Sequence, residues 1–271
     1  MITSAFITPH SPVLIPAIGK ANTELLQKTT LAYQKILDKL LADPVDTVLI
    51  ISPHNPKTPD AFAINSAPEF VIKFESFGDF ATKTKLPGDV TLAHELKENL
   101  KNSANLQLTT NKVLDYGSAI PLWLLSPALK NTKIIAISQA DLSLEDHFAF
   151  GKLLQNELIT RDKKIAIIAS GDLSHRLKRS APGGYSPKGA KFDNKVIEYL
   201  NEAPTASENI LGLDKKLITD AMECGLKSIV MLLGILDRLS FAPQVLAYQT
   251  DFGVGYLTMD MNLTTNPNVR P

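Results

Sequence analysis

The stretch KKIAIIASGDLSH, residues 163–175, decides how the rest of the sequence is interpreted. Its first eight residues form a short apolar run, the pattern of a β-strand that is buried on both faces. The run ends abruptly in a polar segment that contains Asp172, Ser174 and His175. This segment places a carboxylate, a hydroxyl and an imidazole at the point where a buried strand stops. It is either a polar loop or a reaction centre.

Similar apolar runs alternate with stretches of helical periodicity along the chain. We predict strands in residues 2–8, 46–52, 62–66, 70–76, 132–138, 163–170, 243–250 and 254–261, and helices in residues 22–41, 91–103, 143–159, 187–203, 215–223 and 225–239. This order predicts an α/β fold, a single domain with a central, mostly parallel sheet covered by helices on both faces. We expect the domain to span residues 1–263 and residues 264–271 to form a flexible tail.

Composition excludes several classes of function. Lys plus Arg and Asp plus Glu number 28 each in 271 residues, so the zero net charge predicts no nucleic-acid and no membrane partner. Cys224 is the single cysteine, which excludes an internal disulfide and a multi-cysteine zinc site. The N-terminal stretch is a poor signal peptide and no apolar segment has transmembrane length, so we expect a cytoplasmic protein. The sequence leaves a homo-oligomer open.

Histidines follow three of the predicted strands. His10 and His54 each lie in a Pro-His-x-Pro motif, and His175 closes the stretch quoted above. Proline on both sides stiffens the backbone around an imidazole, as a metal ligand requires, although proline also simply ends strands. The other two, His94 and His147, lie within predicted helices beside acidic residues, and we expect both at the surface.

Two histidine ligands need a third ligand, and adjacent residues offer two candidates. Glu223 would complete a two-His, one-carboxylate site, which suits Fe(II) and leaves positions open for substrate and O₂. Cys224 is the alternative ligand and would favour zinc or copper. The structural alternatives are a helix-terminal Glu223 and a Cys224 that serves as a small buried apolar residue.

Together these motifs resemble the LigB-type class III extradiol dioxygenases and their Memo-like relatives. The resemblance covers nearly the whole chain and rests on the order of its motifs: PHSP (9–12), SPH (52–54), GDLSH (171–175), YSPKG (185–189) leading into FD (192–193), ECG (223–225) and FGVGY (252–256). It implies a LigB-like domain with Fe(II) held by His10, His54 and Glu223. It also implies that His175 is the acid–base residue beside the bound catechol. Asp172 lies close enough in the sequence to orient or charge-stabilise this imidazole, so we assign it to catalysis as well.

The sequence departs from the family pattern at DYG, residues 115–117, where family members usually have Asp-His-Gly. The family histidine lines the substrate pocket, so we assign Tyr116 and Ser174 to substrate binding. We therefore predict an extradiol-type dioxygenase that opens the ring of a small catechol-like aromatic with O₂. The alternatives are a Memo-like, non-catalytic metal-binding or interaction protein and a zinc-dependent hydrolase.

Overall fold

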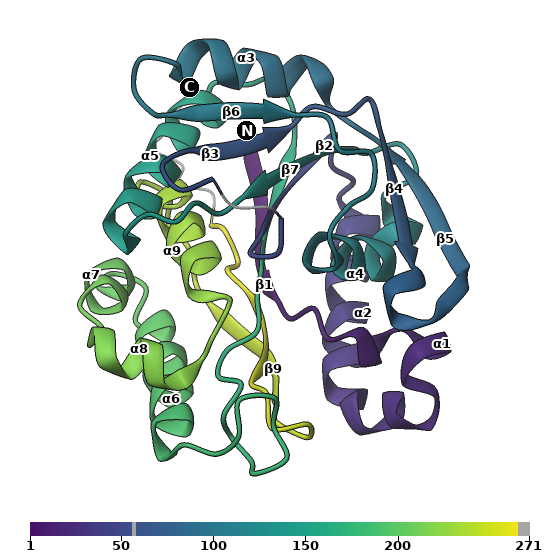
Figure 1. The fold of residues 1–271 in the computed structure, drawn as a ribbon. Helices are drawn as coiled ribbons and strands as arrows, with labels where there is room; N and C mark the ends of the chain where they lie inside the picture. The colour runs from purple at the N-terminus through teal and green to yellow at the C-terminus, as the bar shows by residue number, and fades with distance from the viewer. Residues whose placement is uncertain (56–57, 265–271) are drawn as a thin grey trace.

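The apolar runs of the sequence pair with one another in the middle of a sheet (Figure 1). In the computed structural model, which describes residues 1–55 and 58–264, eight strands form this sheet in the order β6-β3-β7-β2-β8-β1-β10-β9. Their bounds are β1 (Ile2–Thr8), β2 (Thr47–Ser52), β3 (Phe62–Asn65), β6 (Leu106–Thr109), β7 (Lys133–Ser138), β8 (Ile165–Ser170), β9 (Gln244–Gln249) and β10 (Tyr256–Asp260). A separate hairpin pairs β4 (Glu69–Phe74) with β5 (Asp79–Pro87).

The four central strands, β7, β2, β8 and β1, run parallel to one another. Every residue of β2 and β8 is buried, as expected for continuous apolar runs covered on both faces. The strands outside this centre, β3 and β10, pair antiparallel with β7 and β1. The mostly parallel sheet is therefore confirmed, and the carboxyl ends of its four central strands lie along one edge.

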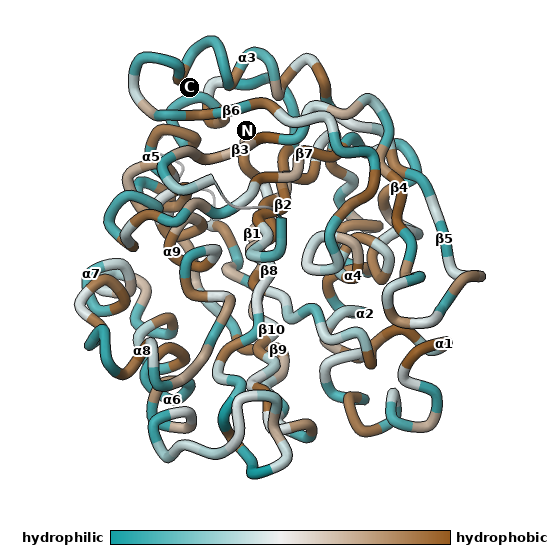
Figure 2. The backbone as a smooth tube through the Cα atoms, viewed as in Figure 1, coloured by the Kyte–Doolittle hydropathy of each residue, from teal (hydrophilic) through white to brown (hydrophobic). Residues whose placement is uncertain are grey.

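Helices cover both faces of the sheet and enclose two apolar cores. One core lies beneath α2 (Gln27–Ala42), α4 (Tyr116–Leu125) and the β4–β5 hairpin. The other lies beneath α3 (Val90–Leu100), α5 (Leu144–Ile159), α6 (Pro187–Asn201), α7 (Ala206–Leu211), α8 (Lys215–Ala221) and α9 (Leu226–Ile235). Figure 2 shows hydrophobic residues concentrated along the central strands and on the inner sides of these helices. The predicted two-sided α/β fold is confirmed.

The differences from prediction concern less regular segments. β5, β6, α4 and α7 were not predicted. Residues 82–85 of β5 are all polar, α4 contains Pro121, and β6 and α7 are short. Residues 20–26 form a 3-10 helix, so α2 begins only at Gln27, and a short α1 (Pro16–Gly19) precedes them. The interpretation of His147 as a surface residue is wrong. Its side chain is fully buried and accepts a hydrogen bond from Ala140 N, whereas His94 is exposed as expected.

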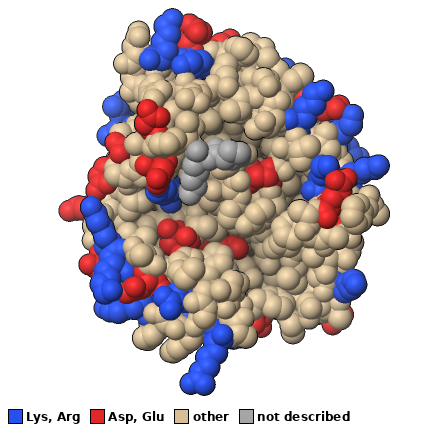
Figure 3. Space-filling model, in the orientation of Figure 1, with Lys and Arg blue, Asp and Glu red and all other residues tan. Residues whose placement is uncertain are grey.

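The outer surface agrees with the balanced charge of the sequence. Figure 3 shows basic and acidic side chains intermixed along the rim of one face of the molecule. Within the described residues, no helix combines the length and apolarity that crossing a membrane requires. Most of the predicted tail, residues 265–271, lies outside the described residues, so its flexibility stays a prediction.

Asp193 generates the first testable prediction. This fully buried residue of α6 accepts hydrogen bonds from Ser174 N (2.9 Å) and from the Tyr248 hydroxyl (2.7 Å), and burial raises its pKa from 3.8 to about 6. The folded state therefore binds the proton of Asp193 more tightly than the unfolded state does. The stability that this proton contributes is present below pH 4 and is lost as the pH rises through 6. We expect the free energy of unfolding to fall by about 2–3 kcal/mol over this range because of Asp193.

Asp193→Asn keeps the shape of the side chain but cannot ionise, so its stability should lack this pH dependence. Urea denaturation of the metal-free proteins at pH 4, 5, 6 and 7 measures the difference. Parallel stability curves for the parent and the variant would contradict the prediction.

Candidate metal centre

The polar residues predicted from strand ends meet at the carboxyl edge of the sheet. His10 follows β1 by two residues, His54 follows β2 and Asp172 follows β8. These three strands are parallel neighbours, and Thr8 pairs in register with Ser170. Their loops therefore emerge side by side, in the place where open α/β sheets bind ligands.

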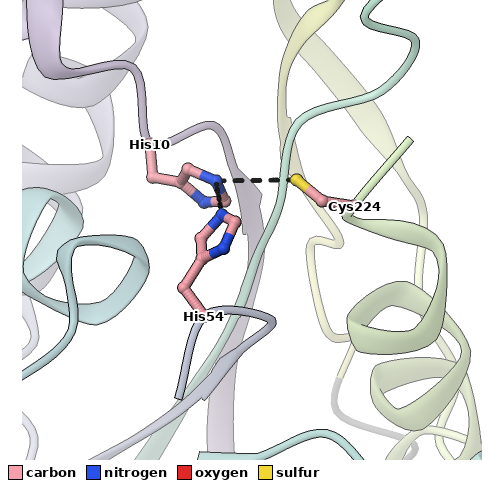
Figure 4. Close-up of side chains that lie close together, drawn as sticks. All are labelled: His10, His54 and Cys224. Carbon is pink, nitrogen blue, oxygen red and sulfur yellow. Dashed lines mark hydrogen bonds between the residues drawn. The ribbon is translucent and has the colours of Figure 1, made fainter. Parts of the chain in front are cut away.

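The structure brings His10, His54 and Cys224 together (Figure 4). The two imidazole Nε2 atoms lie 3.0 Å apart, and Cys224 Sγ lies 3.6 Å from His10 Nε2. One ligand atom from each residue lies within 4.8 Å of the other two. Ligand bonds of about 2.0–2.3 Å around a tetrahedral metal place neighbouring ligand atoms about 3–4 Å apart. The spacing and the donor types of this group therefore fit a single metal ion.

His10 is oriented by a chain of two hydrogen bonds. Its Nδ1 lies 2.9 Å from Ser170 Oγ, and the Ser170 hydroxyl donates to the carbonyl of Gly117 at 2.5 Å. Since the serine proton is used in this second bond, the serine oxygen accepts the proton of His10 Nδ1. That arrangement assigns the Nδ1–H tautomer to His10 and directs the lone pair of Nε2 toward the cluster, as metal binding requires.

His54 is held by the start of α4. Asp115 caps this helix by accepting from Ser118 N, and it also accepts from the Ser52 hydroxyl at 2.5 Å. Ser52 Oγ in turn accepts from His54 N at 3.3 Å. Residue 117 has to be glycine at this close approach, because a Cβ there would lie 2.5 Å from Ser52 Oγ and 3.1 Å from a ring carbon of His54.

Aromatic rings form one wall beside these histidines. Tyr116 stacks on His54 with ring centroids 4.1 Å apart, and Phe77 meets Tyr116 edge-on at 5.5 Å. Phe77 comes from the turn of the β4–β5 hairpin, so this hairpin covers the tyrosine side of the cluster. Burial raises the pKa of Tyr116 above its ordinary value. The phenol therefore stays neutral at physiological pH and can donate a hydrogen bond.

Cys224 and Glu223 point in different directions. Cys224 Sγ faces His10 and accepts from Asp172 N at 3.3 Å. Its carbonyl accepts from the side chain of Gln139, a buried residue that follows β7. Glu223 Oε2 instead accepts from Leu226 N at 2.6 Å, so this carboxylate caps the first turn of α9. Within the described residues, the group that can hold a metal contains the cysteine and not the glutamate.

Asp172, Ser174 and His175 occupy three different environments. Asp172 is buried; its Oδ1 accepts from His10 N (3.0 Å), and its Oδ2 lies 3.8 Å from His10 Nε2. Ser174 is buried and donates to the Ala221 carbonyl at 2.9 Å, which ties this loop to the end of α8. The half-buried His175 has a buried Nδ1 with no hydrogen-bond partner among the described residues.

Burial controls the charges in the cluster. It lowers the pKa of His10 to about 3 and that of His54 to about 4, so both imidazoles are neutral at physiological pH. It also raises the pKa of Asp172 to about 6. Electrostatic interaction with His175 adds to the lowered pKa values of His10 and His54 and opposes the raised pKa of Asp172, so this imidazole shares their electrostatic environment. Neutral imidazoles are the form that metals bind.

Comparison with known families agrees with this geometry. Residues 4–259 match the family described as the catalytic LigB subunit of aromatic ring-opening dioxygenase. The chain belongs to the LigB family. The resemblance predicted from the sequence motifs is therefore confirmed over almost the full length of the chain.

Two individual proteins are also similar to this chain, and neither has a name that states an activity. The chain is 28% identical to protein CA_C1420 of Clostridium acetobutylicum; the match covers 96% of this chain but only 58% of that protein. The fold is similar to the crystal structure of the uncharacterized protein JW3007 from Escherichia coli K12, with a TM-score of 0.68, 19% identity and coverage of 96% and 99% of the two chains. The second comparison supports the fold alone.

Sequence reasoning did not find the residues that support the three clustered side chains. Ser52 and Ser170 are the last residues of β2 and β8, and Gln139 follows β7. A usable signal was present, because each of the four central strands, β1, β2, β7 and β8, ends in a hydroxyl residue. Which of these hydroxyls meets an imidazole depends on strand order, which a single sequence does not reveal.

Ser170→Ala tests the orientation of His10. The variant removes the acceptor for Nδ1–H, so the affinity of the protein for Zn(II) or Co(II) should fall about 10–100-fold. Ser138→Ala is the matched control: it removes the last hydroxyl of β7, which bonds to none of the three clustered residues in the described structure. Equal metal affinities for the two variants, measured by competition with a chelator, would show that Ser170 does not position the ligand.

Proposed function

We propose that this protein is a metal-dependent oxidoreductase of the extradiol type, which opens the ring of a small catechol-like aromatic with O₂. The observation that carries the proposal is the convergence of His10, His54 and Cys224 at the carboxyl edge of the sheet in a chain whose residues 4–259 match the LigB family. We propose Cys224, the alternative ligand of the sequence analysis, as the third donor in place of Glu223, because its sulfur lies in this cluster. The proposed metal is Fe(II), held by two neutral imidazoles and the thiolate.

A metal ion held by His10, His54 and Cys224 would supply Lewis acidity and a common binding point for the diol and O₂. The protein residues supply the remaining steps. His175 is proposed to take the proton of the second hydroxyl, since its Nδ1 makes no hydrogen bond among the described residues and it lies in the electrostatic environment of the cluster. Asp172 holds the His10 backbone and supplies negative charge beside the two neutral imidazoles.

Tyr116 is proposed to line the substrate site. Its ring lies flat on His54, and Phe77 meets the tyrosine edge-on as part of an apolar wall. An aromatic substrate can pack against such a wall, and the neutral phenol can donate to a substrate oxygen. Ser174 is a weaker candidate for substrate contact than the sequence indicated, because its hydroxyl donates to the Ala221 carbonyl.

A second candidate function is Memo-like metal binding without ring cleavage. The observation that favours it is the presence of Cys224 in the cluster while Glu223 caps α9. Thiolate ligands suit Zn(II) and copper better than carboxylates do. Anaerobic purification followed by metal analysis and O₂-uptake assays with catechols separates the two candidates. Iron with substrate-dependent O₂ uptake supports the dioxygenase, and zinc or copper without uptake supports the second candidate.

Two adjacent substitutions test the ligand set. Cys224→Ser should abolish stoichiometric metal binding, since it removes one of three donors. Glu223→Ala should retain the metal and lose about 1 kcal/mol of stability, the usual cost of removing a helix cap. Metal content by mass spectrometry and urea denaturation give the two readouts. If Glu223→Ala loses the metal while Cys224→Ser keeps it, the thiolate assignment is wrong.

His175→Ala tests the proton-transfer role. The variant should keep its metal, because His175 is outside the three-residue cluster. Turnover of any catechol that the parent cleaves should fall by about 10²–10⁴-fold, as expected when a general base is removed. Loss of metal in this variant would identify His175 as a ligand, and unchanged turnover would leave the loop without a catalytic role.

A further inference from the structure

Pro121 lies inside α4, where a proline is unexpected. It is buried in the middle of a helix that runs from Tyr116 to Leu125. A proline in this position lacks the N–H that would bond to the carbonyl four residues earlier, and its ring pushes that carbonyl aside. The carbonyl concerned belongs to Gly117. An internal proline usually costs a helix about 3 kcal/mol, so its presence here calls for a compensating role.

The Gly117 carbonyl is the group that anchors Ser170. The Ser170 hydroxyl donates to it at 2.5 Å, and Ser170 Oγ lies 2.9 Å from His10 Nδ1. All three residues are buried, so water does not replace a lost partner at low cost. An N–H at residue 121 would bond to this carbonyl and align it with the helix axis. Because a carbonyl oxygen has two lone pairs, Ser170 would then share it with that N–H instead of being its side-chain partner alone.

We propose that Pro121 is a positioning residue for His10. By withholding an N–H from Gly117, it leaves that carbonyl to fix the Ser170 hydroxyl, and Ser170 then fixes the Nδ1–H tautomer of His10. Nε2 of His10 is thereby kept as a lone-pair donor facing His54 and Cys224. The effect on metal binding rests on the proposed function, whereas the effect on the tautomer does not.

Two substitutions restore the missing N–H. Pro121→Ala supplies it with a smaller side chain, and Pro121→Val supplies it while nearly keeping the buried volume. Pro127→Ala is the control: it removes an exposed proline from the short 3-10 helix directly after α4. The ¹⁵N spectrum of histidine-labelled, metal-free protein reports which nitrogen of His10 carries the proton. Competition with a chelator reports the Zn(II) affinity, and urea denaturation reports stability.

We expect the parent and Pro127→Ala to show His10 with a protonated Nδ1. Both Pro121 variants should show mixed protonation of the two His10 nitrogens. They should also bind Zn(II) about tenfold more weakly, because the Ser170 hydroxyl no longer holds the His10 ring in one tautomer. The free energy of unfolding of these two variants should not fall together with their Zn(II) affinity, since α4 gains a hydrogen bond. This opposition between stability and metal affinity is not expected if the proline only fills space.

The outcomes separate the two proposals. If the parent binds no metal, the proposed function fails, and the ¹⁵N spectra alone decide the role of Pro121. If one Pro121 variant does not fold, the other gives the comparison. The inference would be overturned if a folded Pro121 variant had the same His10 tautomer and the same Zn(II) affinity as the parent protein. Failure of both variants to fold would also overturn it, since Pro121 would then be required for folding itself.

Discussion

The close approach of two imidazole nitrogens, Nε2 of His10 and Nε2 of His54, is the contact on which the rest of the site depends. Burial keeps both rings neutral. Two neutral nitrogens 3.0 Å apart repel each other through their lone pairs unless a proton or a metal ion lies between them. The fold holds this pair after the ends of two separate strands, so the rigid parallel sheet fixes the two nitrogens at a spacing that a shared proton or a metal ion can bridge.

Each member of the cluster is supported by the end of a different strand. Ser170 at the end of β8 orients His10, Ser52 at the end of β2 supports the His54 backbone, and Gln139 after β7 bonds to the segment of Cys224. Strands that are buried on both faces can place polar groups only at their ends. The same constraint that makes the sheet stable therefore gathers its polar groups at one edge, where they can support a reaction centre.

The sequence predicted what local patterns encode. Continuous apolar runs identified the central strands, and two proline-flanked histidines identified the side chains that meet. It did not predict β5, whose residues 82–85 are all polar, or α4, whose glycine and proline interrupt helical periodicity. His147 was misplaced because acidic neighbours on a helix do not reveal which face packs inward. Choosing between Glu223 and Cys224 required tertiary contacts, namely the bonds to Asp172, Gln139 and Leu226.

Family membership fixes where the reaction centre lies more firmly than which reaction occurs there. A carboxylate and a thiolate in adjacent positions give the centre different chemistry, because the thiolate is a softer, more electron-donating ligand. The backbone between α8 and α9 decides which of the two faces the histidines. Met222 begins this segment in the left-handed conformation (φ 51°, ψ 46°), and Glu223 is then held by its bond to Leu226 N. The end of α8 and the start of α9 thus turn the Cys224 sulfur toward His10 and the Glu223 carboxylate toward Leu226 N, so two helix termini decide which donor faces the histidines.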